Sequence, residues 1–400
     1  MSELSIRVLY LHPAAAFGGA SKSLIELFTR LRALGVQGTV LTPDGPVCPA
    51  FEAVGMDVRK VKGLSQFDNT RFSHYRRLRW LILLRELFLL PFSLAAIWRL
   101  RGERFDLLHV NEVTLLPLAM VAKWMLRVPM VVHVRSLQRA PGSGLRTRLV
   151  NAWLRRHADA IVPIDHTVAA TLAADLPLSI VHNGLGIENN LLPPSSQITE
   201  KPIRVGFLGV LIPLKGIYEL VEAMRILKAR NVNIECLVAG ENARHLSGLK
   251  AWALRTLGFA DDVRANVEGM ISDYGLQNHV QLLGSVVDVR SLYPQLDILC
   301  FPSHLDAAGR PVFEAAFYSI PSVVAITNPV PDAILHEVTG LAIPRPDPVL
   351  LADALQRLTE DHVLRQTLGR QARTWAEENF AIEVNAQLMH ELYLRLLSKS

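Results

Sequence analysis

Cysteine is scarce in this sequence, which has three cysteines among 400 residues. They form no C-x-x-C pair, and an odd number cannot all join in disulfides, so we expect buried free thiols in a reducing compartment. Long hydrophobic runs are also lacking, because prolines interrupt the longest uncharged stretch, residues 315–331. A membrane-spanning helix needs about 20 apolar residues, and no signal-peptide pattern opens the chain. The sequence therefore predicts a cytoplasmic protein, either free or peripheral on the cytoplasmic face of the membrane.

Signatures of several enzyme classes are missing too. The sequence has no H-E-x-x-H, no G-x-S-x-G of hydrolases, no P-loop and no G-x-G-x-x-G dinucleotide loop. We therefore expect no metal and no bound cofactor. Lys and Arg outnumber Asp and Glu by 42 to 37. This scattered excess predicts no nucleic-acid partner, but it suits an anionic ligand or an anionic membrane surface.

What the sequence does contain is an alternation of short apolar runs with longer stretches of helical period. This alternation predicts an α/β protein with parallel sheets covered by helices. In the first half we expect helices over residues 21–34 and 113–126, and strands over residues 6–11, 38–41, 106–110, 130–134, 160–163 and 179–181. In the second half we expect strands over residues 204–208, 235–239, 280–283, 298–301 and 322–326.

The two halves of the chain begin alike. IRVLYLH at Ile6 and IRVGFLG at Ile203 each lead through a glycine-containing loop into a helix, the unit that opens a Rossmann-type domain. The length also suits two domains rather than one. We therefore predict one domain over residues 1–185 and a second over residues 186–378. The tail predicts two helices joined near residues 379–382, the last of which, residues 379–400, packs back on the first domain.

Loops that follow the predicted strands of the second half carry the first candidate site residues. Ligands of open parallel sheets bind beyond the carboxyl ends of the strands. Lys215 lies beside a helix start, where an ammonium group and backbone N–H groups suit a phosphate. Asp306 and Glu314 flank another helix start, at Gly309 and Arg310, and their carboxylates suit sugar or ribose hydroxyls. The structural alternatives are a solvated lysine and an acid favoured by the helix dipole.

The strand over residues 130–134 supplies a candidate pair in the first half. His133 and Arg135 are two residues apart, so their side chains lie on the same side of the strand. For His133, and equally for His109 and His182, a buried core histidine is the structural alternative. An arginine at a strand end is more difficult to explain by packing alone.

Taken in chain order, these loops resemble the retaining glycosyltransferases of the GT-B fold, in the large family-four group. The resemblance covers nearly the whole chain and lies in the Gly18-Gly19 loop, VHNGLG at Val181, VGFLG…LKG at Val205, DILCFPS at Asp297, the acidic-x7-acidic stretch and TGLAIP at Thr339. It implies two Rossmann-like domains facing across a cleft. The second domain would bind a nucleotide sugar, and the first would bind the acceptor.

The resemblance also implies a role for each candidate. Lys215 would neutralise the donor diphosphate, Asp306 would hold hydroxyls of the transferred sugar, and Glu314 would hold the ribose hydroxyls. The remaining donor contacts would come from Gly18, Gly19, Gly209, Gly309 and Arg310. His133 and Arg135 would lie on the acceptor or phosphate side. No metal is required by such a site.

Some positions depart from the family pattern. Val210 stands where an arginine is usual, which removes one of two expected diphosphate cations, and we expect Arg135 or Arg310 to replace it. Asp306 stands where a glutamate is usual, and residues 328–332 read N-P-V-P-D instead of G-G-x-x-E. These departures leave a non-catalytic binding subunit as an alternative, beside a nucleotide-sugar epimerase of the same fold. The donor base, the sugar and the acceptor are not predicted.

Residues 71–101 predict a membrane-facing segment. They mix arginines with aromatic side chains, among them Trp80, Phe88, Phe92 and Trp98. Basic, aromatic-rich amphipathic helices lie in the bilayer interface, although helices that only cover the sheet are the alternative. Because lipid-linked acceptors are frequent in the family, the resemblance implies an acceptor that is a polysaccharide, a lipopolysaccharide or a lipid-linked glycan.

Overall fold

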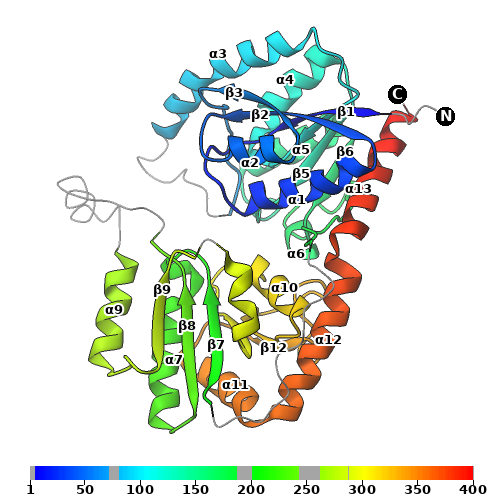
Figure 1. Cartoon of the computed structure of the whole chain (residues 1–400). Coiled ribbons are helices and arrows are strands. Elements are labelled where there is room, and N and C mark those ends of the chain that lie inside the picture. The colour runs from blue at the N-terminus through cyan, green and yellow to red at the C-terminus, as the bar shows by residue number, and fades with distance from the viewer. Residues whose placement is uncertain (1–4, 72–80, 187–200, 243–261, 287, 400) are drawn as a thin grey trace. The chain divides into compact units, whose positions relative to one another are not determined.

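The computed structural model of the chain describes residues 5–71, 81–186, 201–242, 262–286 and 288–399. The chain forms two compact units. Unit 1 comprises Met1–Gly186 and Asn379–Ser400, and unit 2 comprises Ile187–Glu378. Each unit contains a six-stranded parallel sheet with helices packed on it (Figure 1).

The sheet of unit 1 has the strand order β3-β2-β1-β4-β5-β6. Successive strands are added on one side of β1 up to β3 and on its other side from β4 onward. The strands are β1 Ile6–Leu11, β2 Val36–Pro43, β3 Asp57–Val61, β4 Leu107–Val110, β5 Met130–Val134 and β6 Ala160–Pro163. Side chains alternate between the faces, so Val8 and Tyr10 enter one hydrophobic core while Leu9 and Leu11 enter the other. A parallel strand buried on both faces therefore has a continuous apolar sequence.

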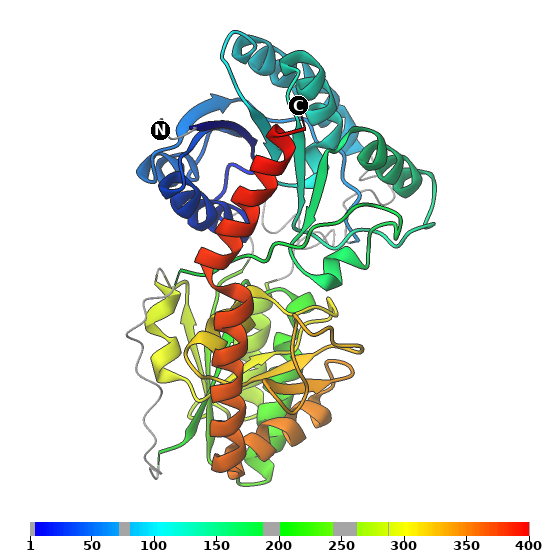
Figure 2. The same ribbon diagram turned by 90° about the vertical axis from the view of Figure 1, so that its right-hand side faces the viewer.

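Helices cover both faces of this sheet. The core that contains Val8 is completed by α1 Gly19–Ala33, α2 Cys48–Ala53 and α13 Ile382–Leu397. The opposite core is completed by α3 Ile82–Leu100, α4 Leu116–Leu126 and α5 Leu145–His157. A short helix, α6 His166–Ala169, follows β6. The last helix of the chain, α13, is red in Figure 2 and packs against α1.

The sheet of unit 2 has the order β12-β11-β10-β7-β8-β9. Its strands are β7 Ile203–Leu208, β8 Ile234–Ala239, β9 Val280–Gly284, β10 Ile298–Phe301, β11 Ser322–Ala325 and β12 Gly340–Ile343. The helices are α7 Ile217–Ala229, α9 Val263–Asp273, α10 Arg310–Phe317, α11 Pro348–Glu360 and α12 His362–Phe380, whose last residues belong to unit 1. In this sheet the order reverses between β7 and β10, so the loops after these two strands lie at the switch point where ligands bind in such sheets.

The structure differs from the sequence prediction mainly at the sheet edges. Residues 179–181 form no strand, and only an isolated bridge joins Ile161 to Leu178 there. The unpredicted strands β3 and β12 are both terminal strands of their sheets. In β3 the sequence DVRKV is mostly exposed, as is common in edge strands, which are short and charged. The hydrophobic pattern that revealed the central strands is therefore absent from β3, whereas β12 has the apolar sequence GLAI and is largely buried.

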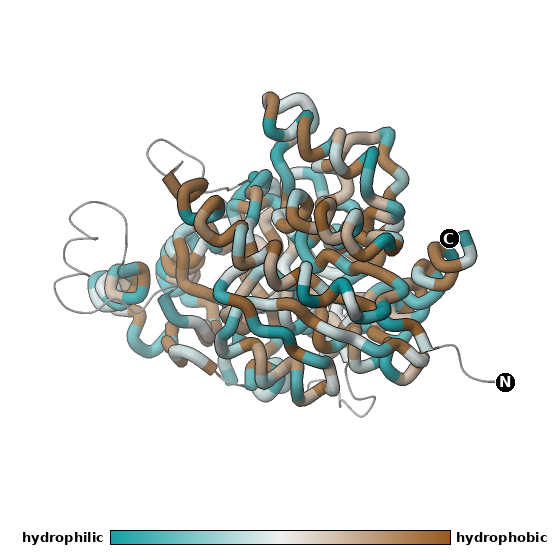
Figure 3. Tube along the Cα trace, turned by 90° about the horizontal axis from the view of Figure 1, so that it is seen from above, coloured by the Kyte–Doolittle hydropathy of each residue, from teal (hydrophilic) through white to brown (hydrophobic). Residues whose placement is uncertain are grey.

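The predicted membrane-facing segment contains α3, which ends at Leu100, whereas residues 72–80 lie outside the described part of the chain. Among the described residues, no helix has both the length and the hydropathy needed to cross a bilayer. Figure 3 shows hydrophobic and hydrophilic residues following one another at short intervals along the chain.

Candidate functional site

In unit 2, the loop after β7 is shaped by glycines. Gly209 follows the strand, and the next residue, Val210, is exposed. A 3-10 turn, Pro213–Lys215, then leads into α7 through Gly216, whose φ is +75°. A Cβ atom on Gly216 would lie 1.8 Å from the carbonyl oxygen of Pro302. Only glycine therefore allows this loop to meet the loop after β10 so closely.

Lys215 is the half-buried cation of this region. Its Nζ lies 4.7 Å from the centre of the Phe301 ring, and burial lowers the pKa of the lysine. No ion pair joins Lys215 to a carboxylate among the residues that the structure describes. An ammonium group over an aromatic face and without an acidic partner is well suited to receive an anionic ligand.

The Phe301 ring that contacts Lys215 is also in contact with Gly309. A Cβ atom on Gly309 would lie 2.3 Å from Cζ of Phe301. Gly309 is the N-cap residue of α10, whose first turn contains a proline. The glycine thus lets the ring lie against the helix start, and the ring in turn supports the lysine. Sequence analysis predicted Lys215 and Gly309 but not Phe301, which reads as an ordinary core residue.

Glu314 is a buried carboxylate held by side chains on either side. Its Oε1 accepts a hydrogen bond from Nε of Arg310 (2.8 Å) and its Oε2 accepts one from the hydroxyl of Tyr293 (2.6 Å). Burial, and then the charge of Glu314, raises the pKa of Tyr293 well above its usual value. Arg310 is therefore engaged with Glu314, and the role of Glu314 toward ribose hydroxyls stays a prediction. Tyr293 was not predicted from the sequence.

Asp306 has a left-handed backbone conformation, with φ of +55°. Its Oδ1 accepts a hydrogen bond of 2.7 Å from the backbone N–H of Thr327, just after β11. The carboxylate thus ties the loop after β10 to the end of the neighbouring strand. Its predicted role toward the hydroxyls of the sugar stays a prediction.

His304 and Glu219 form a second link between the loops after β7 and β10. Nε2 of His304 lies 2.8 Å from Oε1 of Glu219, and the backbone N–H of His304 donates to the carbonyl oxygen of Leu214 (3.0 Å). Among the described residues the other oxygen of Glu219, Oε2, is buried without a hydrogen-bond partner. Sequence reasoning missed this pair because nothing in the spacing of residues 219 and 304 connects them.

The ends of β8 and β9 complete this edge of the sheet. The backbone N–H of Gly240 donates to the carbonyl oxygen of Gly284 (2.9 Å). Nη1 of Arg264 lies 2.5 Å from Oε2 of Glu241, and it would lie 3.3 Å from a Cβ atom on Gly284. Arg264 is therefore a further cation at this edge, paired with acidic side chains, which sequence analysis did not single out.

In unit 1, a chain of buried hydrogen bonds begins at Arg135, directly after β5. Its Nε donates to Oδ1 of Asn111 (2.9 Å), and its Nη1 donates to Oδ1 of Asn183. Its Nη2 lies 3.2 Å from Nδ1 of His133, so the predicted pair does lie on one side of the strand. Asn183 lies in the VHNGLG sequence, but neither Asn183 nor Asn111 was predicted as a site residue.

The chain continues from Asn111 to the first helix. Nδ2 of Asn111 donates to Nδ1 of His12 (2.8 Å), which leaves the proton of this ring on Nε2, 3.0 Å from the hydroxyl oxygen of Ser21. Burial, and then the charge of Arg135, lowers the pKa of His12 to about 3. The imidazole is therefore neutral, as its role of accepting from an amide requires.

His109 links the same chain to α13. Its Nδ1 lies 2.6 Å from the hydroxyl of Tyr393, and its Nε2 lies 3.3 Å from Nδ1 of His133. Burial and Arg135 lower the pKa of His109 to about 3 and that of His133 well below its usual value. At neutral pH the histidines of this cluster are uncharged. Arg135 therefore supplies its positive charge.

Gly18 and Gly19 lie at the start of α1. A Cβ atom on either glycine would meet nothing within 4 Å, and the first turn of α1 has no side-chain cap and no acidic residue. The space beside these glycines and the backbone N–H groups at the helix start is therefore open on unit 1, as an approaching phosphate requires.

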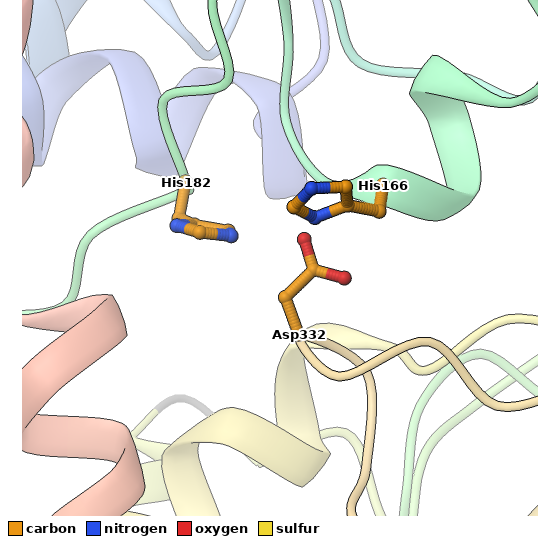
Figure 4. A group of neighbouring side chains, drawn as sticks. All are labelled: His166, His182 and Asp332. Atoms are coloured by element: carbon orange, nitrogen blue, oxygen red, sulfur yellow. The ribbon is translucent and has the colours of Figure 1, made fainter.

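His182, in the loop after β6, is the remaining histidine singled out from the sequence. Its backbone N–H donates to Oδ1 of Asn385 (2.9 Å), and its ring lies 4.8 Å from that of Phe380. Figure 4 shows this ring and that of His166 at the start of α6. Asp332, also labelled there, is a buried residue of unit 2 from the N-P-V-P-D sequence. The backbone of His182 thus binds α13, and its ring packs on the last residue of α12.

The contact of Gly309 with Phe301 leads to a prediction. In Gly309→Ala, the added methyl group displaces the Phe301 ring and with it the support of Lys215. A displacement of about 1 Å in a catalytic group costs about a hundredfold in rate, so we expect a loss of that size in kcat/KM for the donor. Gly269→Ala is the matched control, because a Cβ atom on Gly269 meets nothing within 4 Å. Equal rates in the two variants would contradict the role given to Gly309.

Comparisons with known proteins identify the family of both halves of the chain. Residues 189–375 match the family of glycosyl transferases group 1, and residues 18–183 match the glycosyl transferase 4-like domain. The capsular polysaccharide biosynthesis glycosyltransferase CapM of Staphylococcus aureus is 25% identical over 199 residues, which are 49% of this chain and 47% of CapM. A glycogen synthase of Mycobacterium tuberculosis is 22% identical over 411 residues, covering 97% of this chain and 94% of that protein.

A solved structure extends the similarity to the whole fold. The crystal structure of Anabaena HepE in complex with UDP-glucose has a TM-score of 0.71 at 20% identity, and the match covers 99% of this chain and 100% of HepE. The two Rossmann-like units, their strand orders and both family matches lead to one conclusion. The chain is a group 1 glycosyltransferase with the GT-B fold.

Proposed function

We propose that the protein is a retaining, metal-independent glycosyltransferase that moves a hexosyl or related sugar from a nucleotide-sugar donor to a polysaccharide, lipopolysaccharide or lipid-linked acceptor. The observation that carries the proposal is the position of Lys215, a half-buried cation without an acidic partner among the described residues, at the switch point of the unit 2 sheet. Gly309 and the buried Glu314 lie on the neighbouring loop and helix. HepE, which was crystallised with UDP-glucose, supports a nucleotide-sugar donor.

The chemical difficulty of such a reaction is the departure of a nucleoside diphosphate from the anomeric carbon. Lys215 and the backbone N–H groups near Gly309 stabilise the negative charge that develops on the leaving oxygen. Gly18 and Gly19 at the start of α1 contribute further N–H groups. Arg135 supplies the positive charge that an arginine at position 210 would supply in other members of the family. Asp306 and Glu314 hold hydroxyls of the sugar and of the ribose.

Retention through a covalent intermediate would require a carboxylate beneath the anomeric carbon. The two acidic candidates are already engaged, since Asp306 accepts from Thr327 and Glu314 accepts from Arg310 and Tyr293. We therefore favour substitution on one face of the sugar. The bond from the anomeric carbon to the diphosphate breaks as the bond to the acceptor oxygen forms. The proton of the acceptor hydroxyl moves to an oxygen of the departing phosphate.

The acceptor class rests on the relatives and on α3. CapM, by its name, acts in capsular polysaccharide biosynthesis. The outer face of α3 exposes Leu84, Leu87, Phe88 and Phe92, and such a face suits the interface of a bilayer. We propose that the protein works on the cytoplasmic face of the membrane, held there by the segment of residues 71–101, where an acceptor with a lipid anchor would be available.

The donor assignment is tested by thermal-shift measurements with UDP-, GDP-, ADP- and TDP-sugars. We expect one base class to raise the Tm of the native protein, because a ligand at about 100 times its Kd stabilises the folded state by about 2.7 kcal/mol. The shift should disappear in Glu314→Ala and persist in Tyr293→Phe, which keeps the carboxylate. A nucleotide that stabilises Glu314→Ala as well as the native protein would contradict the proposed donor site.

Turnover separates the remaining alternatives. A transferase releases nucleoside diphosphate only when a glycan or lipid extract is present, and NMR of the product should show the anomeric configuration of the donor. EDTA should leave the rate unchanged. Turnover of the donor without acceptor would indicate an epimerase. Binding without turnover would indicate a non-catalytic subunit, the function that Val210 favours.

A further inference from the structure

A cavity of about 710 Å³ lies in unit 1, away from the candidate site. It is lined by the end of α3, by α4 with the residue that follows it, and by the last residue of α5. Each of these segments precedes a strand of the parallel sheet, whereas Arg135 and the Gly18-Gly19 loop follow strands. The cavity therefore lies at the amino-terminal ends of the strands, whereas the candidate site lies at their carboxyl ends. The volume of the cavity is within the range of small-molecule sites.

The lining of this cavity is basic. Arg101, Lys123, Arg127 and His157 contribute to it, and none of its lining residues is acidic. Lys123 is occupied, since its Nζ donates to Oδ2 of Asp159 (2.5 Å) and to the carbonyl oxygen of His157 (2.9 Å). Within the described part of the chain, neither Arg101 nor Arg127 forms an ion pair. Two guanidinium groups are thus available for an anion, and the planar N–H groups of a guanidinium suit phosphate oxygens.

Cations at the ends of helices also stabilise the helix dipole, and Lys123 has this role at the end of α5. Arg101 and Arg127 are the C-cap residues of α3 and α4, so their charges also favour the dipoles of these helices. The guanidinium carbon of Arg101 lies 4.9 Å from the centre of the Trp98 ring, so this group stacks on an aromatic side chain. Interaction with a helix dipole leaves the N–H groups of both guanidinium groups able to donate to an anion.

The apolar part of the lining is exposed to an unusual degree. Trp98 is 55% exposed and Trp124 is 78% exposed. Tryptophan is the residue most typical of the interface between water and bilayer. The exposed side chains of α3, including Phe88 and Phe92, come from the helix that ends at this cavity, and Nζ of Lys62 lies over both rings at 4.8 and 4.9 Å. Basic and apolar groups together fit an amphiphile with an anionic head.

We propose that this cavity, the Trp98–Trp124 pocket, binds the phosphate-bearing head group of an anionic phospholipid in the bilayer. Arg101 and Arg127 bind the phosphate, and the two tryptophans lie at the level of the head groups. The inference rests on the membrane association proposed above and adds to it a specific site. Inorganic phosphate shares the charge but lacks the acyl chains that the exposed apolar side chains would contact.

The test is sedimentation of the full chain with vesicles. Phosphatidylcholine vesicles are compared with vesicles that contain equal parts of phosphatidylcholine and phosphatidylglycerol. An arginine near an anionic surface contributes about fivefold in binding, so we expect Arg101→Gln/Arg127→Gln to bind the anionic vesicles about 25-fold more weakly than the native protein. The matched control is Arg148→Gln/Arg156→Gln, which makes the same change of charge at exposed positions of α5 and should bind like the native protein.

A second measurement identifies the source of the phosphate. Brominated acyl chains should quench the fluorescence of the native protein, and Trp98→Phe/Trp124→Phe should lose the quenched component. Saturation of the pocket by inorganic phosphate, with equal binding to both vesicle types, would contradict a lipid ligand. If the arginine variants and the native protein bind the anionic vesicles equally, the proposed lipid site in the Trp98–Trp124 pocket is wrong, but the proposed membrane association is supported. If the native protein binds neither vesicle type, the lipid site and the membrane association are both wrong. Donor turnover, measured in parallel, tests the proposed transferase independently of these outcomes.

Discussion

Lys215→Met should lower kcat/KM for the nucleotide-sugar donor by about 100- to 1,000-fold. The methionine keeps most of the volume of the lysine against Phe301 but removes the charge, and loss of a preorganised donor to a developing negative charge has an effect of this size. The measurement is the initial rate of nucleoside diphosphate release with acceptor present. Lys201→Met, at an exposed position of unit 2, is the control for a general loss of charge. A Lys215→Met enzyme within a few-fold of the native rate would remove Lys215 from the proposed mechanism.

The same residue sets an expectation for pH. The ammonium form binds the diphosphate, and burial holds the pKa of Lys215 below its ordinary value. Donor affinity should therefore fall as the pH rises through this lowered pKa, earlier than for a solvated lysine. In Lys215→Arg the guanidinium stays charged. The alkaline limb of the affinity profile should then move to higher pH even if the absolute affinity is reduced.

Arg135→Met is expected to lower the transfer rate by tens- to a hundredfold. A charge-assisted hydrogen bond to phosphate contributes about 1.5–3 kcal/mol, and in our proposal Arg135 replaces the cation that is missing at Val210. Arg310→Met tests the other candidate. Because Arg310 already donates to Glu314, we expect its loss to affect donor binding through the position of Glu314. Full rates in both variants would exclude the compensation.

A second measurement on Arg135→Met, the pKa values of the buried histidines, distinguishes loss of the Arg135 charge from loss of folding. The charge of Arg135 contributes to the lowered pKa values of His12, His109 and His133. In the variant these pKa values should rise, although burial keeps them below that of a solvated histidine. NMR titration measures the change. Arg135→Lys should keep the values low and restore part of the rate. Raised pKa values with a full transfer rate would make Arg135 a structural residue only.

The sequence was sufficient to predict the α/β architecture, because the central strands are apolar on both faces and are followed by glycine loops and helices. The GT-B fold followed from the order of motifs along the chain, and the family matches and HepE confirm it. The edge strand β3 was missed for a physical reason. A strand that contacts one neighbour and solvent carries polar residues, so DVRKV does not show the apolar run of a buried strand. The other missed edge strand, β12, has the sequence GLAI and is largely buried, so polarity does not explain why it was missed.

The side chains that contact the site residues could not be predicted from the sequence. Phe301 contacts Lys215, and Tyr293 donates to Glu314, yet the sequence separation of each pair has no period that a helix or strand would produce. Both aromatic residues lie in apolar surroundings where many side chains would satisfy the pattern. Only the packing of loops after different strands determines which of them meets a charged group.

The contact between His109 and Tyr393 has a consequence for the order in which the protein can mature on the ribosome. Unit 1 includes Asn379–Ser400, and α13 fills the same core as β1 and α1. All of unit 2 is synthesised before this helix. Until α13 has been synthesised, unit 1 therefore lacks one of the helices that cover this face of its sheet, and His109 lacks its partner Tyr393. The half of the protein that is translated first is thus the half that is completed last.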